Sequence, residues 1–161
     1  PLHFAAIVNN VEIGKILLKK IDINAVDYLG RTPLLYAIIS HSAEFINFLL
    51  NNKNIDVNIA SVLILQLYIM KFVNFIFDWS FYHFFYLTPF HYLIVDNDEF
   101  TFNLLFPKIN IKNKLKSTII IYAARYGRNN ILKQLCIKFP ELINNVDENG
   151  INFIFIYDSF D

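Results

Sequence analysis

The sequence predicts an all-α fold, a solenoid of stacked helix-turn-helix units with projecting turns. The first observation behind this prediction is a turn that leads straight into a helix at residues 27–34. Asp27 and Gly30 are the first and last residues of a segment with the pattern that a type I turn favours. Thr32 then offers an N-cap hydroxyl, and Pro33 suits the first helical position.

The second observation is that this motif recurs along the chain. The column that holds Pro33 falls at positions 1, 33, 89, 119 and 153, so successive copies lie 32, 56, 30 and 34 residues apart. A fixed period of about 20–50 residues is typical of repeat proteins, in which each unit buries its apolar face against its neighbours. We therefore expect several similar units and no single closed core.

The letters at the helix starts are also alike. Residues 1–6, 32–37 and 88–93 are PLHFAA, TPLLYA and TPFHYL, and residues 118–124 (TIIIYAA) are a weaker copy. This pattern resembles the ankyrin repeat, which has a period of about 33 residues and a TPLHxA signature. The resemblance covers most of the chain and implies a right-handed array of repeats. It divides the chain into repeats at about residues 1–31, 32–58, 88–117 and 118–151, with a partial repeat at 152–161.

Within each repeat, apolar residues at helical spacing predict a second helix. These residues are Val11, Ile13, Ile16, Leu17 and Leu18 in the first repeat, Phe45, Ile46, Phe48, Leu49 and Leu50 in the second, and Ile131, Leu132, Leu135 and Cys136 in the fourth. The third repeat departs from the pattern because residues 107–116 contain neither Asp nor Gly. We expect its turn to be shortened or reshaped.

Composition narrows the functional classes. The chain is 55% hydrophobic and 17% charged, which favours a packed protein over a disordered one. Fourteen basic residues balance fourteen acidic ones, so no nucleic-acid partner is expected.

A single Cys excludes an internal disulfide framework, and with the lack of a glycosylation acceptor it favours an intracellular, cytoplasmic location. Frequent Ile, Asn, Phe, Lys and Tyr indicate an AT-rich genome, because these residues can be encoded with A and T alone. Pro1 occupies the column that Thr precedes in the family pattern, and the missing Thr indicates that the sequence is a fragment.

No residue pattern predicts catalysis, a metal site or a cofactor. His3 and His91 occupy the fourth column of the signature, where the resemblance implies a hydrogen bond to an adjoining turn. His41 is expected in an interhelix loop and His83 in the interruption, neither with a ligand partner at a recognised spacing. Cys136 is expected to be a small core residue, not a nucleophile.

Two local charge clusters have simple structural interpretations. Asp96, Asp98 and Glu99 are expected to begin a helix, where negative charge suits the helix dipole. A basic run, Lys108, Lys112, Lys114 and Lys116, is interpreted as a solvated turn, with an acidic partner or a nucleic-acid backbone as the alternative. Four scattered Gly residues do not form a phosphate-binding loop.

Two function classes remain open. The resemblance implies a non-catalytic scaffold or adaptor that binds another protein. The alternative is a regulatory or targeting region of a larger enzyme or membrane protein whose other domains are missing here. The complete open reading frame would separate these two classes.

The resemblance also places a binding surface on the turn tips and the exposed side of the first helices. Carried over to this chain, it comprises Val26, Tyr28, Leu29, Arg31, Ile39, Ser40, Arg125, Tyr126, Glu148, Asn149 and Ile151. Tyr28 and Arg31 are the expected anchors, because Tyr and Arg are enriched among energetically dominant interface residues. Alanine at either position is expected to weaken binding with little effect on thermal stability.

The 56-residue spacing between Pro33 and Pro89 exceeds one period by about 23 residues. The excess lies in residues 59–87, and residues 62–87 are rich in Phe, Tyr, Leu and Ile. A membrane span is disfavoured, since it would include Lys71 and Asp78 and separate adjacent repeats. A packed hydrophobic insertion and a translated intron both remain open. The intron is slightly favoured, because a T-rich tract precedes splice sites and would encode the Phe, Tyr and Leu residues that crowd toward Leu87.

Overall fold

The computed structural model describes residues 1–62, 86–110 and 115–142. Regular structure in these ranges is helical except for one pair of two-residue strands, so the predicted all-α class is confirmed. The chain forms two compact units, residues 1–92 and residues 93–161. The boundary between them falls within helix α6 (Pro89–Asp96).

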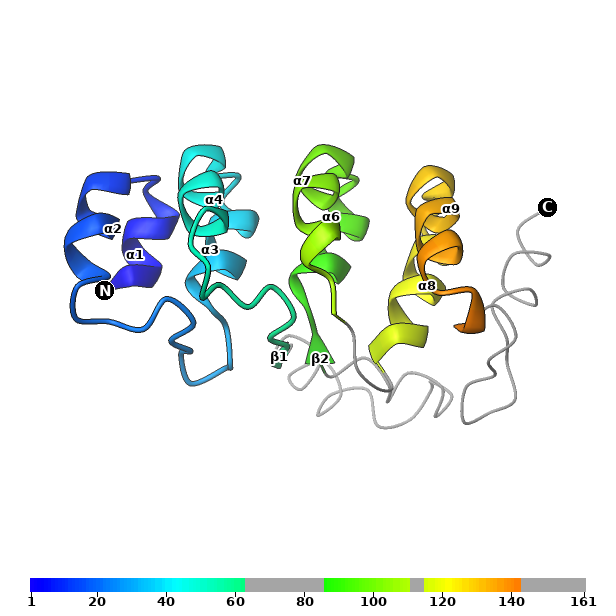
Figure 1. Ribbon diagram of the computed structural model, residues 1–161, viewed down its shortest axis with the longest axis horizontal. Coiled ribbons are helices and arrows are strands. Elements are labelled where there is room, and N and C mark those ends of the chain that lie inside the picture. The colour runs from blue at the N-terminus through cyan, green and yellow to red at the C-terminus, as the bar shows by residue number, and fades with distance from the viewer. Residues whose placement is uncertain (63–85, 111–114, 143–161) are drawn as a thin grey trace, which may run out of the picture. The chain divides into compact units, whose positions relative to one another are not determined.

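Two helix pairs form most of the first compact unit. Helix α1 (Leu2–Ile7) pairs with α2 (Val11–Leu17), and α3 (Pro33–Ile39) pairs with α4 (Ala43–Leu50). The pairs lie side by side, with α1 against α3 and α2 against α4 (Figure 1). Ala5, Ala6 and Ala37 are buried in the first helices. Their small side chains let neighbouring helices approach closely.

The helix starts follow the predicted capping chemistry. Thr32 has an extended backbone with ψ 163°, and its Oγ1 accepts a hydrogen bond of 3.2 Å from the Leu35 N–H. Pro33 is the first residue of α3. Asn10 caps α2 in the same way, because its Oδ1 accepts a 2.9 Å bond from the Ile13 N–H. Each cap satisfies a backbone donor that the helix itself leaves unpaired.

The second compact unit contains the end of α6, α7 (Glu99–Leu105), and α8 (Leu115–Arg125) paired with α9 (Asn129–Lys138). Short 3-10 helices follow α7 and α9, η2 (Phe106–Lys108) and η3 (Pro140–Leu142). The core of the unit includes Phe102, Leu105, Ile119, Ile131 and Leu135.

Residues with a left-handed backbone mark the loop inside each helix pair. They are Asn9 (φ 54°), His41 (φ 52°), Asn97 (φ 59°) and Gly127 (φ 63°). Each residue's N–H donates to the carbonyl three residues earlier, and the next N–H donates to the carbonyl five residues earlier than itself, which is the Schellman motif. The four residues are separated by 32, 56 and 30 positions, the same spacings as the Pro column. Residues that share a column in the sequence alignment therefore also share a position in the structure of each helix pair.

The extra residues of the long spacing lie between the second and third helix pairs. Strands β1 (Ser61–Val62) and β2 (Tyr86–Leu87) pair antiparallel, with Ser61 opposite Leu87 (Figure 1). The Ser61 hydroxyl also donates to the Leu87 carbonyl at 3.2 Å. Val62 and Tyr86, the residues on either side of the intervening segment, are therefore neighbours in this strand pair. Residues 63–85, where most of the predicted insertion or intron falls, lie outside the described residues, so both interpretations of it stay predictions.

The first helix of the fourth repeat begins earlier than expected. The sequence places the start of the fourth repeat's first helix at Thr118, but α8 begins at Leu115. Proline disfavours the helical conformation of the residue before it, which keeps Thr32 extended, and Ile119 imposes no such restriction. Helix η2 lies at the start of the third repeat's turn, whereas residues 111–114 lie outside the described residues, so the expected reshaping of this turn stays a prediction.

The apolar stripe predicted for α2 is not a buried one. Ile13 and Ile16 are 46% and 65% exposed, and the buried residue of α2 is Gly14. A Cβ at Gly14 would lie 2.8 Å from Cε2 of Phe45 and 2.9 Å from Cε1 of Phe48. Helices α2 and α4 therefore contact each other through the phenyl rings of Phe45 and Phe48, which pack against the backbone of Gly14. In α4 the predicted stripe is confirmed, with Phe45, Ile46 and Leu49 buried.

We predict that Gly14→Ala lowers the free energy of unfolding by about 1–2 kcal/mol. Alanine favours a helix over glycine by about 1 kcal/mol, but overpacking against the fully buried Phe45 costs more. Chemical denaturation of the full chain measures the difference. Ile16→Ala, on the exposed side of α2, is the control and should change stability by less than about 0.5 kcal/mol. A stabilised Gly14→Ala chain would contradict this packing.

Candidate interaction surface

The turn between the first two helix pairs is organised by the carboxylate of Asp27. One oxygen accepts hydrogen bonds from the Leu29 and Arg31 N–H groups, both at 2.9 Å. The other accepts from the Arg31 guanidinium and from the Tyr36 hydroxyl at 2.8 Å. The Gly30 N–H donates to the Asp27 carbonyl at 2.9 Å, and Gly30 has φ 74°. The predicted turn over residues 27–30 is confirmed.

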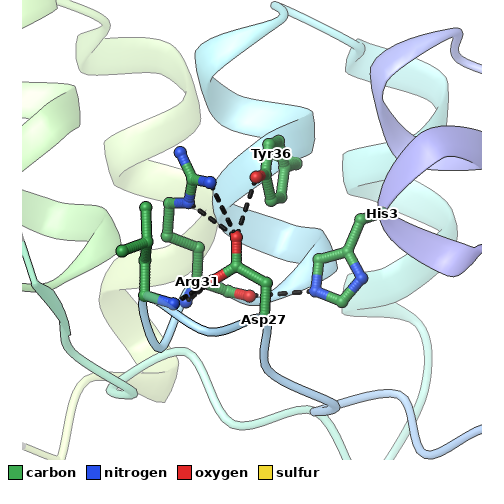
Figure 2. A network of polar contacts seen from close by, with 5 residues as sticks. His3, Asp27, Arg31 and Tyr36 are labelled. Atoms are coloured by element: carbon green, nitrogen blue, oxygen red, sulfur yellow. Dashed lines mark hydrogen bonds and ion pairs between the residues drawn. The ribbon is translucent and has the colours of Figure 1, made fainter.

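The turn is joined to both neighbouring first helices. Figure 2 shows the Asp27 carboxylate facing Arg31 and Tyr36, with the ring of His3 at the Arg31 carbonyl. The His3 Nε2 lies 2.9 Å from that carbonyl oxygen, and its ring meets Tyr36 edge-to-face at 5.3 Å. The Arg31 guanidinium carbon lies 4.7 Å from the centre of the Tyr36 ring. The implied bond from His3 to the adjoining turn is present.

These contacts change the ionisation of the cluster. Partial burial alone would raise the pKa of Asp27, but hydrogen bonds from Arg31, Tyr36 and Leu29 outweigh it and lower the pKa from 3.8 to about 2. Burial, together with the bond to Asp27, raises the pKa of Tyr36. Asp27 therefore stays ionised as the partner of Arg31 at neutral pH.

With Asp27 turned inward, the neighbouring side chains project from the turn. Tyr28 is 88% exposed and Val26 is 53% exposed, so both are available to a partner. Leu29 is half-buried. The Arg31 side chain is only 25% exposed and its Nη2 lies 2.7 Å from Asp27. Arg31 thus holds the turn together, and its replacement by alanine is now expected to lower stability, unlike the sequence-based expectation.

The first helices contribute the rest of the predicted surface. Ile39 is 42% exposed at the end of α3, and Ser40 is half-buried beside it. In the second compact unit, Arg125 and Tyr126 are exposed at the end of α8. Glu148, Asn149 and Ile151 lie outside the described residues, so their placement stays a prediction.

Sequence reasoning did not name the exposed apolar residues at equivalent positions on α1 and α6. Ile7 and Val95 occupy the same repeat position as Ile39, six residues after the Pro column, and each is 39% exposed. Val8 occupies the position of Ser40 and is 64% exposed. The register alone could have identified these residues, because carrying Ile39 back by 32 positions gives Ile7. In the first compact unit, α1 and α3 therefore present neighbouring apolar side chains.

The remaining histidine and cysteine candidates have structural roles. His91 is fully buried, and its Nδ1 lies 3.1 Å from the Thr88 N and 2.8 Å from the Thr88 hydroxyl, within its own helix start. Burial lowers its pKa from 6.5 to about 3. His41 lies in the predicted interhelix loop, and His83 is outside the described residues. Cys136 is half-buried on α9, and burial raises the pKa of its thiol.

The charge clusters are only partly as predicted. Asp98 caps α7 by accepting a 2.9 Å bond from the Thr101 N–H, and Glu99 lies in its first turn. Asp96 instead ends α6, because the left-handed Asn97 separates the two helices. Lys108 is exposed in η2 and Lys116 lies in α8, whereas Lys112 and Lys114 are outside the described residues.

Neither a metal centre nor a membrane span is found in the described ranges. Within residues 1–62, 86–110 and 115–142, no group of three His, Cys, Asp or Glu side chains could hold a metal ion. Among the helices of the same ranges, none has the length and apolar character needed to cross a bilayer.

Comparison with known proteins agrees with this geometry. A family model described as "Ankyrin repeats (3 copies)" matches residues 1–61, which contain α1 to α4 and the Asp27 turn. Residues 1–61 are therefore similar to ankyrin repeats. Ankyrin repeats are generally protein–protein interaction modules, and domains built from them are typically non-catalytic. A comparison with curated proteins finds no match.

We predict that Asp27→Asn lowers the free energy of unfolding by about 1–2 kcal/mol at pH 7, after the remaining exposure of the pair is allowed for. Because the folded pKa lies below the unfolded one, this stabilisation is complete above about pH 5 and fades as the pH falls toward 2. Urea denaturation at several pH values measures it. Glu12→Gln removes a carboxylate that is also 2.7 Å from a cation but 80% exposed, and should cost less than about 0.5 kcal/mol. Equal effects of the two variants would contradict the role of Asp27.

A second pH dependence follows from His91. The pKa of His91 is lower in the folded chain than in the unfolded chain. Below about pH 6.5 the unfolded chain therefore binds a proton at His91, whereas the folded chain does not. Stability should therefore fall by about 2 kcal/mol between pH 7 and pH 5, above the main carboxylate range. In His91→Asn, whose amide oxygen replaces Nδ1, we expect lower stability at both pH values and a much smaller difference between them. Equal wild-type stability at pH 7 and pH 5 would contradict the buried neutral state.

Proposed function

We propose that this chain acts as a non-catalytic scaffold or adaptor that binds another protein through its turn tips and the exposed side of its first helices. The observation that carries the proposal is the inward-facing Asp27 cluster, which leaves Tyr28 and Val26 projecting on a fixed turn. An aromatic side chain on a preorganised backbone loses little conformational freedom on binding, which favours its use as an anchor.

The apolar residues of α1 and α3 extend this surface. Ile7 and Ile39 have the same repeat position in adjacent helices, and both are about two-fifths exposed. Val8 lies next to Ile7 and is more exposed still. Asp27 neutralises Arg31 within the turn, so the projecting part of this surface is mainly apolar. A partner with an apolar contact face fits it better than a highly charged one.

The same surface serves the alternative, in which the chain is a regulatory or targeting region of a larger enzyme or membrane protein. No contact in the described structure favours that alternative over a free-standing adaptor. The complete open reading frame is the observation that separates the two.

The experiment uses a photo-crosslinking amino acid at Tyr28 to capture the partner, which mass spectrometry then identifies. With that partner in hand, Tyr28→Ala and Ile39→Glu should each weaken binding by about 30-fold, corresponding to about 2 kcal/mol, while thermal stability stays nearly unchanged. Phe100→Ala is the matched control, because Phe100 is 73% exposed but lies on α7, a second helix. Its affinity should equal that of the wild type. Unaltered affinity of both Tyr28→Ala and Ile39→Glu would contradict the proposed surface.

A further inference from the structure

The second helix of the third repeat, α7, carries a row of exposed residues that is mainly apolar. The members of the row are Phe100, Asn103, Leu104 and Pro107. The last three follow Phe100 by three, four and seven positions, which places them close to one side of a helix that η2 continues. Phe100 is 73% exposed and Leu104 is 38% exposed. We call these four residues the α7 face.

The other repeats show that Phe100 stands at a position where the stacking of helix pairs leaves the side chain in solvent. The residues that share its repeat position, eleven after the Pro column, are Glu12, Glu44 and Asn130. All three are polar and exposed. Contacts between successive repeats therefore do not account for a phenyl ring at this position, and the third repeat differs from the others here.

The two ends of the α7 face carry opposite charges. Asp98 and Glu99 precede Phe100, and the carboxylate of Asp98 is held at the helix start because it accepts a 2.9 Å bond from the Thr101 N–H. Lys108 directly follows Pro107 and is exposed in η2. The face is therefore acidic where α7 begins and basic where η2 ends.

Helix α9 strengthens this difference between the two ends. The Lys138 ammonium donates to the Phe106 carbonyl at 2.9 Å, so it adds a cation at the basic end. Arg128, just before α9, donates its guanidinium to the Ile94 and Val95 carbonyls and is therefore directed toward α6. The charge difference along the α7 face is thus a property of the folded unit as well as of the sequence.

A face of this kind is complementary to itself when two copies meet in antiparallel orientation. A two-fold interface brings the same patch of both copies together. With the axis between Asn103 and Leu104, Phe100 lies opposite Pro107 of the second copy, and Glu99 lies opposite its Lys108. Opposite charges then meet at both ends, whereas a parallel arrangement would bring like charges together.

We propose that the α7 face is a self-association interface, and that its occupant is the α7 face of a second copy of this chain. The Phe100 ring packs on Leu104 and Pro107 of the second copy, and Glu99 pairs with its Lys108. One short helix from each copy forms a small interface, and interfaces below about 1,200 Å² are typical of weak association. The proposed binding surface contains none of these residues, so the two proposals are independent.

Sedimentation equilibrium of the full chain at low salt, over micromolar to millimolar concentrations, measures the dimer. Phe100→Glu should raise its dissociation constant at least about 30-fold. Because Glu stands at the same repeat position in the first two repeats, the fold accommodates this change. Phe4→Glu is the matched control, since Phe4 is 72% exposed but lies on α1, and its dissociation constant should equal that of the wild type.

A pair of charge reversals tests the antiparallel orientation. Glu99→Lys alone and Lys108→Glu alone each place like charges opposite one another, so each should weaken the dimer about tenfold. A chain that carries both reversals should regain the wild-type dissociation constant, because opposite charges meet again.

The proposal is overturned if the wild-type chain stays monomeric throughout, which would leave the α7 face to a different protein. It is also overturned if Phe100→Glu leaves the dimer intact, or if the double reversal binds no better than the single ones. Each of these outcomes leaves the partner-binding proposal intact, since Tyr28 and Ile39 are unaltered in every variant.

Discussion

The Asp27 carboxylate is the interaction on which the first two repeats most depend. It accepts two backbone and two side-chain hydrogen bonds within one turn, and these determine where Arg31, Tyr28 and the start of α3 lie. His3 of α1 binds the same turn through the Arg31 carbonyl, so the turn also links successive helix pairs. The Asp27 carboxylate therefore stabilises the turn that His3 of α1 contacts and from which Tyr28, the proposed anchor, projects.

Much of the fold could be predicted from the sequence because its local chemistry and its period agree. Asp27, Gly30, Thr32 and Pro33 each favour the conformation that the structure shows. The alignment column does not predict the early start of α8, because Ile119 lacks the restriction that proline places on the residue before it. The exposure of Ile13 and Ile16 was also missed, because periodicity shows which residues are apolar and cannot show whether a neighbour covers them.

The candidate surface was predicted only in part. Tyr28, Val26 and Ile39 are exposed as the resemblance implied, but Arg31 is held by Asp27. Residue type alone favoured Arg31 as an anchor, and its internal ion pair depends on a side-chain geometry that the sequence does not specify. The contribution of α1 became visible once equal exposure at Ile7 and Ile39 could be compared. Exposure at a repeated position is thus more informative here than residue type.

Amide hydrogen exchange of the wild-type chain at neutral pH tests most directly whether the Asp27 carboxylate organises the turn. The N–H groups of Leu29 and Arg31 have no helical partner, and both donate to the Asp27 side chain. Our account predicts that these two amides exchange about as slowly as those of Tyr36 and Ser40, which donate within α3. Exchange of Leu29 and Arg31 at the rate of an unstructured peptide would contradict it.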